Sequence, residues 1–184
     1  MVGRLIAAAR AVDAVNDVLG RAVAWLTLIM VLTQFTVVMM RYVFGLSSLY
    51  MQESIVYMHA IVFLAAAGYT LLHEGHVRVD IFYGSANERR RAWTNLLGVV
   101  LLLWPMAGTT LLASWGYVLA SWRVFEVSPE GTAGLPAIFL LKTFIWVFAT
   151  VLILQGFSLA VHSLGVILGL EQSSTPQAEE EHAL

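Results

Sequence analysis

Four long stretches without a charged side chain constrain this chain more than any other feature of its sequence. They cover residues 22–40, 54–72, 92–122 and 143–170. A helix of about 20 apolar residues matches the roughly 30 Å hydrocarbon core of a bilayer. Only 12% of the residues are charged, whereas a soluble domain has about a quarter. The sequence therefore predicts an all-α membrane protein with four transmembrane helices, arranged as two hairpins within residues 22–170.

The third stretch is longer than a bilayer requires. As a helix, residues 92–122 would extend about 46 Å, so the helix must tilt, kink or protrude. Pro105 predicts a kink, because proline breaks the hydrogen-bond ladder of a helix. In the second stretch, the small residues Ala65 to Gly68 are expected to let a neighbouring helix approach closely.

The two ends of the chain are more polar. Residues 1–21 contain three arginines and two aspartates, with apolar residues recurring at three- and four-residue steps. This pattern predicts an amphipathic helix that lies at the membrane interface; an extension of the first transmembrane helix is the alternative. Residues 171–184 are polar and acidic, and we expect them to be disordered.

The distribution of basic residues predicts the orientation in the membrane. The N-terminal segment contains three Lys or Arg residues, and the central segment, residues 73–91, contains four. The two opposite loops together hold Arg41, Arg123 and Lys142. Because basic segments tend to stay in the cytoplasm, both termini and the central segment are predicted to be cytoplasmic.

Composition and motifs argue against several function classes. A net charge of -2 gives no reason to expect a nucleic-acid partner. The chain has no cysteine, which excludes disulfides, thiolate-bound metals and a cysteine nucleophile. It shows no Gly-rich nucleotide loop, hydrolase elbow or zinc-ligand pattern. We therefore expect neither an enzyme nor a bound cofactor or metal.

Histidines in the apolar stretches leave one cofactor alternative open, because paired histidines in helix bundles can bind haem. His59 and His162, however, are predicted to differ in depth by more than about 10 Å. Gln155, Ser158 and His162 occur at i, i+3 and i+7. They form a polar stripe that is expected to face protein rather than lipid.

Charged residues also flank the predicted turns. Arg41 and Glu53 have opposite charges and similar predicted depth, which predicts an ion pair between them or a contact with a partner. His76 and Asp80 are four residues apart, so one helical turn would bring them together. We interpret the second pair as structural rather than as a metal site.

Several of these motifs, taken in order, resemble the small permease subunit of the tripartite ATP-independent periplasmic (TRAP) transporters, the DctQ type. The resemblance covers about residues 20–168. It is carried by Arg41-Tyr42-Val43-Phe44-Gly45, Tyr50-Met51-Gln52-Glu53, His76-Val77-Arg78-Val79-Asp80 and Gly134-Leu135-Pro136. The family commonly has Trp and a pair of Glu residues where this chain has Tyr50, Gln52 and Glu53.

The resemblance implies a subunit of the bacterial inner membrane that has no solute site of its own and is surrounded by membrane lipids. Its partners would be a large permease subunit and a periplasmic solute-binding protein that delivers a solute, commonly an organic acid. Transport would be driven by an ion gradient. The alternatives are a membrane anchor for a haem-containing oxidoreductase and a self-contained small exporter.

The resemblance also suggests two groups of site residues. Arg41, Tyr50 and Glu53 would lie at the periplasmic edge and contact partners. His76, Arg78 and Asp80 would fix the cytoplasmic corner between the two hairpins.

Overall fold

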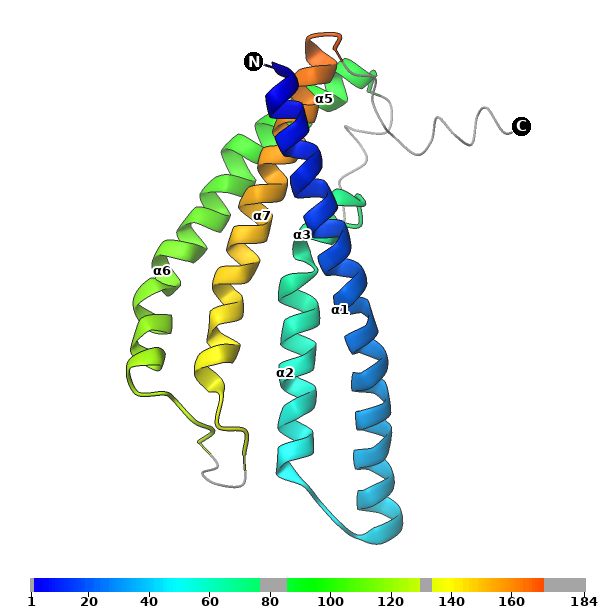
Figure 1. The fold of residues 1–184 in the computed structure, drawn as a ribbon, viewed down its shortest axis with the longest axis vertical. Helices are drawn as coiled ribbons and strands as arrows, with labels where there is room; N and C mark the ends of the chain where they lie inside the picture. The colour runs from blue at the N-terminus through cyan, green and yellow to red at the C-terminus, as the bar shows by residue number, and fades with distance from the viewer. Residues whose placement is uncertain (1, 77–85, 130–133, 171–184) are drawn as a thin grey trace, which may run out of the picture.

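A computed structural model describes residues 2–76, 86–129 and 134–170, which form helices and no strand (Figure 1). The helices are α1 (Val2–Phe44), α2 (Leu49–Ala65), α3 (Ala67–Leu72), α5 (Glu88–Gly98), the π-helical segment η1 (Val99–Leu103), α6 (Trp104–Arg123) and α7 (Ile138–Ile167). Four helical units are long and apolar enough to cross a membrane: Gly3–Phe44, Leu49–Leu72, Glu88–Arg123 and Ile138–Ile167. The predicted all-α fold with four transmembrane helices is confirmed.

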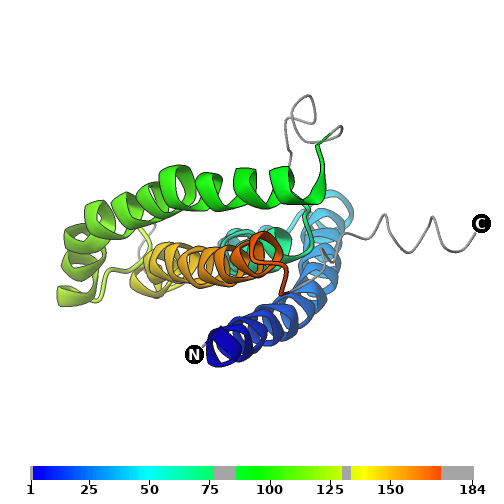
Figure 2. The ribbon, with the colours of Figure 1, turned by 90° about the horizontal axis from the view of Figure 1, so that it is seen from above.

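The last helix is the centre of the bundle. Viewed from above, α7 lies between α5 and α6 on one side and α1 on the other (Figure 2). Buried residues recur along α7 from Ala149 to Gly165. The connection between α1 and α2 (residues 45–48) and the connection between α6 and α7 lie at one end of the bundle, which we call the turn end (Figure 1). At the other end, the terminal end, α1 and α5 begin and α7 ends.

The first helix differs from the expectation of a separate interfacial helix. α1 runs without a break from Val2 to Phe44, so residues 2–21 continue the first transmembrane helix, which was the alternative. The physical reason is that the side of this segment formed by Ala9, Asn16 and Gly20 packs against other helices of the bundle. Ala9 is fully buried, and its carbonyl oxygen accepts a hydrogen bond from Ser158 of α7.

The long third helix contains an irregular segment. η1 lies immediately before α6, in which Pro105 is the second residue. Proline has no N–H to donate to the carbonyl four residues earlier, and a π-helical turn is one way in which a helix absorbs such a break. The indole N–H of Trp104 donates to the carbonyl of Ile153 at 3.3 Å, which ties this segment to α7.

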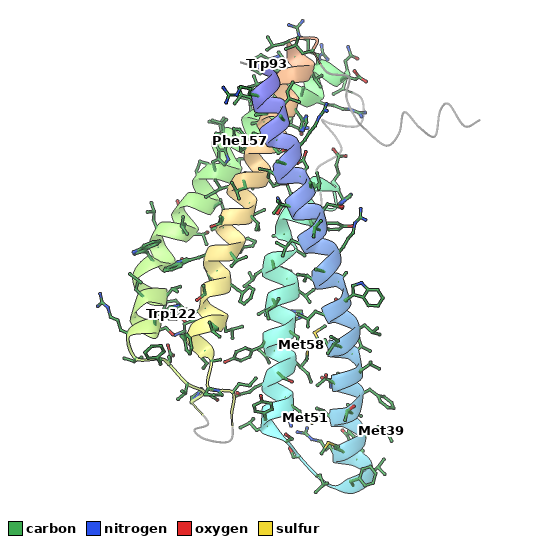
Figure 3. The ribbon with its side chains drawn as sticks, in the orientation of Figure 1. Met39, Met51, Met58, Trp93, Trp122 and Phe157 are labelled. Carbon is green, nitrogen blue, oxygen red and sulfur yellow. The ribbon has the colours of Figure 1, made fainter. Side chains whose placement is uncertain are left out.

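Aromatic side chains mark both ends of the third helix. Trp93 lies near its start at the terminal end, and Trp122 lies near its close at the turn end (Figure 3). Amphipathic aromatic rings favour the headgroup level of a bilayer. Their positions are those of a helix that extends from one interface to the other.

Small residues set the distance between α1 and the second span, as the run Ala65 to Gly68 predicted. Ala65, Ala67 and Gly68 are buried. A Cβ atom on Gly68 would lie 2.6 Å from Oδ1 of Asn16. A Cβ atom on Gly20 would overlap the ring of Tyr69 and lie 2.5 Å from the Cβ of Tyr69. Each helix therefore presents a glycine to a larger side chain of the other.

Gly20→Ala is expected to destabilise the bundle. The ring of Tyr69 can rotate, but its Cβ is fixed to the backbone, so α1 and α3 would have to move apart. Overpacking of this kind costs about 1–3 kcal/mol. Gly116→Ala is the control, because its Cβ would meet nothing within 4 Å, and a helical Gly→Ala change is stabilising by up to about 1 kcal/mol. Equal thermal unfolding midpoints of the two purified variants in one detergent would contradict this packing.

Candidate functional site

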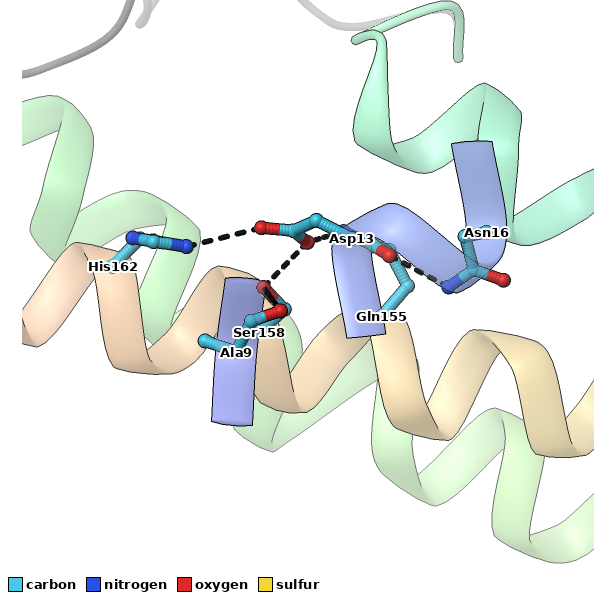
Figure 4. A network of polar contacts seen from close by, with 6 residues as sticks. All are labelled: Ala9, Asp13, Asn16, Gln155, Ser158 and His162. Atoms are coloured by element: carbon cyan, nitrogen blue, oxygen red, sulfur yellow. Dashed lines mark hydrogen bonds and ion pairs between the residues drawn. The ribbon is translucent and has the colours of Figure 1, made fainter. Parts of the chain in front are cut away.

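A polar cluster joins α1 to α7 and is centred on the carboxylate of Asp13 (Figure 4). Oδ1 of Asp13 accepts hydrogen bonds from Nε2 of Gln155 at 2.8 Å and from Oγ of Ser158 at 2.6 Å. Oδ2 lies 3.1 Å from Nε2 of His162. Asn16 completes the set by donating from Nδ2 to Oε1 of Gln155 at 2.7 Å. We call these five residues the Asp13 cluster.

The cluster explains the polar stripe on α7. Gln155 and Ser158 are buried, with exposures of 2% and 0%, so the prediction that the stripe faces protein is confirmed. Its partners on α1 were missed, although Ala9, Asp13 and Asn16 share one side of a helix at i, i+4 and i+7. That spacing was the available signal.

Hydrogen bonds to a charged acceptor are stronger than those between neutral groups. In the Asp13 cluster the carboxylate receives them from two side chains of the neighbouring helix. The arrangement therefore holds α1 and α7 in one register.

Asp17, one turn further along α1, makes a more exposed link to the second span. Its Oδ2 lies 2.6 Å from the guanidinium of Arg21, and its Oδ1 lies 3.1 Å from Nε2 of His73. The ring of His73 contacts that of Tyr69, with centroids 4.2 Å apart. This link lies just beyond the end of α3, beside the contact between Gly20 and Tyr69.

At the turn end, Glu53 of α2 holds the connection between α6 and α7. Oε1 accepts a hydrogen bond from Oγ of Ser128 at 2.5 Å, and Oε2 accepts one from the backbone N–H of Leu135 at 2.6 Å. Gly134 must be small, because a Cβ there would overlap Ser128 and lie 2.7 Å from Oε2 of Glu53. We call these four residues the Glu53 anchor.

A second set of contacts fixes the same connection to α7 itself. Nζ of Lys142 lies 2.5 Å from Oε2 of Glu126 and 4.1 Å from the centre of the Tyr117 ring. The hydrogen bond from the ammonium group of Lys142 holds the pKa of the Glu126 carboxyl below its usual value. The indole N–H of Trp122 donates to Oγ1 of Thr143 at 2.9 Å. The α6–α7 connection is thus held by α2 on one side and by α7 on the other.

The structure places the predicted site residues in different surroundings. Glu53 is bonded within the protein, whereas Arg41 is exposed and Tyr50 is 55% exposed. Among the described residues, Arg41 and Glu53 do not form the ion pair that was one of the two expectations for them; both oxygens of Glu53 accept hydrogen bonds from the α6–α7 connection instead. His76 is exposed. Arg78 and Asp80 lie outside the described residues.

The histidines of the spans are likewise separated. His162 contacts Asp13, His73 contacts Asp17, and His59 is exposed on α2. Within the described ranges, no group of three or more His, Cys, Asp or Glu side chains is placed to hold a metal ion. Two of these histidines link helices: His162 joins α7 to α1, and His73 joins the end of α3 to α1.

Comparison with known families finds a match over most of the chain. Residues 29–172 match the family described as tripartite ATP-independent periplasmic transporters, DctQ component. No curated protein and no solved structure gives a significant match. The matched range includes the Glu53 anchor but begins after Asp13 and Asn16.

Proposed function

This chain belongs to the DctQ family of tripartite ATP-independent periplasmic transporters, and on that premise we propose that it scaffolds a large permease subunit in the membrane. The large subunit would move the solute, an organic acid, into the cell at the expense of an ion gradient. A periplasmic binding protein would deliver the solute. The family match over residues 29–172 is the observation that carries the proposal.

The architecture supports a scaffolding role. Buried or partly buried polar contacts tie α1 to α7 and α2 to the α6–α7 connection. Large apolar side chains such as Trp25, Phe35 and Leu112 are exposed on the outside of the bundle. The apolar exterior suits a bundle embedded in lipid, and the internal bracing gives it the rigidity that a scaffold needs.

In this proposal the turn end faces the periplasm of a bacterial inner membrane, and both termini are cytoplasmic. The excess of basic residues in residues 1–21 and 73–91 supports that orientation. Arg41 and Tyr50 would then be exposed to partners, and the Glu53 anchor would hold the α6–α7 connection near the docked binding protein. His76, Arg78 and Asp80 would fix the cytoplasmic corner.

Reconstitution tests the proposal directly. Vesicles that contain this chain and its large permease subunit, supplied with the binding protein, solute and an ion gradient, are expected to accumulate solute. Vesicles with either membrane subunit alone are expected to show only background uptake. Uptake by this chain alone would establish the exporter alternative, and a Soret band in the purified chain would establish the haem-anchor alternative.

The orientation has its own test, because the chain has no natural cysteine. Val127→Cys introduces a single thiol at an exposed position of the turn end. A membrane-impermeant maleimide is expected to label it in intact spheroplasts. Labelling only after lysis would reverse the proposed orientation.

A further inference from the structure

A groove between α1 and α2 contains two polar side chains at positions within the apolar stretches. The groove has a volume of about 530 Å³ and is lined by Met30, Val31, Gln34, Ile55, Val56 and His59. Gln34 is seven residues from Arg41, and His59 is six residues from Glu53. His59 and Gln34 therefore lie about 9 Å and about 10.5 Å along their helices from the nearest charge at the turn end.

Neither polar group is satisfied within the bundle. Gln34 and His59 are both exposed, and among the described residues neither forms a hydrogen bond with another part of the protein. The ring of His59 only stacks along that of Phe63, with centroids 6.3 Å apart. Gln155, the glutamine of the last span, is 2% exposed and bonded to both Asp13 and Asn16.

This contrast indicates what covers the groove. An amide or imidazole that faces acyl chains loses its hydrogen bonds to water and gains none in return. Polar side chains at this depth accordingly face protein or a water-filled cavity. The other lining residues are apolar, so the complement is an apolar surface that carries a hydrogen-bonding group, which lipid tails lack.

We propose that this groove is the seat of a transmembrane helix of the large permease subunit, which places a hydrogen-bonding side chain between Gln34 and His59. The inference rests on the proposed function and adds the face of the small subunit that makes the contact. Met30, Val31, Ile55 and Val56 supply the apolar walls. Gln34 can both donate and accept, so a partner hydroxyl or carboxamide fits it in either direction.

Photocrosslinking in the assembled complex tests the location. A photoreactive amino acid replaces Val56, which lines the groove and is 58% exposed, and in a matched variant it replaces Leu112 of α6, which is 77% exposed. We expect an adduct with the co-expressed large subunit from position 56, in clearly higher yield than from position 112. An adduct with a second copy of this chain, an adduct with lipid, or equal yields at both positions would overturn the proposal.

Affinity measurements test the polar pair. Gln34→Leu and His59→Leu are each expected to weaken binding of the purified large subunit by roughly threefold to twentyfold, the range for one hydrogen bond between membrane helices. The control is Thr33→Val, because the Thr33 hydroxyl already bonds the carbonyl of Ile29. This variant is expected to bind the large subunit with the affinity of the unmodified chain. The thermal midpoint of isolated Gln34→Leu is expected to be unchanged or higher, since the Gln34 side chain bonds no other residue in the described part of the chain.

Unchanged affinity in both leucine variants would overturn the inference and leave the scaffolding function standing. If the unmodified chain does not bind the large subunit at all, the proposed function fails first and the inference fails with it. Loss of affinity in Thr33→Val as well would show a general effect of this helix face, and it would overturn the specific role of the polar pair.

Discussion

Asp13→Ala is expected to lower the free energy of unfolding by about 2–4 kcal/mol, because it removes the charged acceptor of two buried donors. The amide of Gln155 is left without an acceptor, and the hydroxyl of Ser158 keeps only its longer bond to the Ala9 carbonyl. The amide of Gln155 and the hydroxyl of Ser158 both donate to Asp13. Both side chains are buried, so water cannot replace the lost acceptor without opening the contact between α1 and α7. A loss of this size lowers the unfolding midpoint of a chain of this length by roughly 4–16 °C.

Two variants separate this effect from a general loss of charge on α1. Asp13→Asn keeps one acceptor oxygen for Gln155 or Ser158, so its midpoint should fall between those of the alanine variant and the unmodified chain. Asp17→Ala removes the neighbouring carboxylate, whose partners Arg21 and His73 are exposed. It should have a much smaller effect. If Asp13→Ala and Asp17→Ala unfold at the same temperature in the same detergent, the Asp13 cluster does not hold the bundle together.

The number and type of helices were predictable because the bilayer leaves few choices. A long charge-free segment in lipid must satisfy its backbone hydrogen bonds internally, and a helix does so within one segment. The helix bounds were less predictable, since a charge ends an apolar stretch without ending a helix. Arg4, Arg10, Asp13, Asp17 and Arg21 all lie within α1, so the predicted span 22–40 covers less than half of that helix.

The polar stripe of α7 was predictable from periodicity, but its partner was not. Spacing along one helix identifies which side chains share a side. It does not identify the neighbouring helix that lies against that side. Asp13 and Gln155 are 142 residues apart, and their contact depends on the packing of the first helix beside the last.

Glu53 was identified as a site residue, and its charge suggested Arg41 as a partner. One of its two donors is the backbone N–H of Leu135, a group that nearly every residue possesses and that no sequence pattern marks. The useful sequence signal was Gly134 next to Leu135, because the carboxylate leaves no room for a side chain there.

Glu53→Ala is expected to reduce solute uptake by about tenfold or more while the complex with the large subunit still assembles. The change removes both acceptors that hold the α6–α7 connection. A hydrogen bond to a charged group contributes about 1.5–3 kcal/mol, and 1.4 kcal/mol corresponds to a tenfold change in the equilibrium constant between the anchored and the released connection. Under the proposed function, a loosened connection would present a less defined surface to the binding protein.

The neighbouring variants make this expectation specific to the anchor. Glu53→Gln keeps one acceptor oxygen but turns an amide N–H₂ toward the other donor, so uptake should be intermediate. Gln52→Ala is the matched control, because among the described residues the Gln52 side chain bonds only Ser47 of the α1–α2 connection. It should transport like the unmodified chain.

A spin label on Val127→Cys supplies a structural readout beside transport. Val127 is exposed and adjacent to Ser128. In Glu53→Ala the anchor is released, so the electron paramagnetic resonance lines of the label are expected to narrow. In Gln52→Ala the anchor stays intact, so the lines are expected to be unchanged. Narrowed lines with normal uptake would show that the anchor orders the α6–α7 connection but that docking of the binding protein does not depend on it. Unchanged lines would show that the contacts to α7, which are the Lys142–Glu126 ion pair and the Trp122–Thr143 hydrogen bond, hold the connection without Glu53.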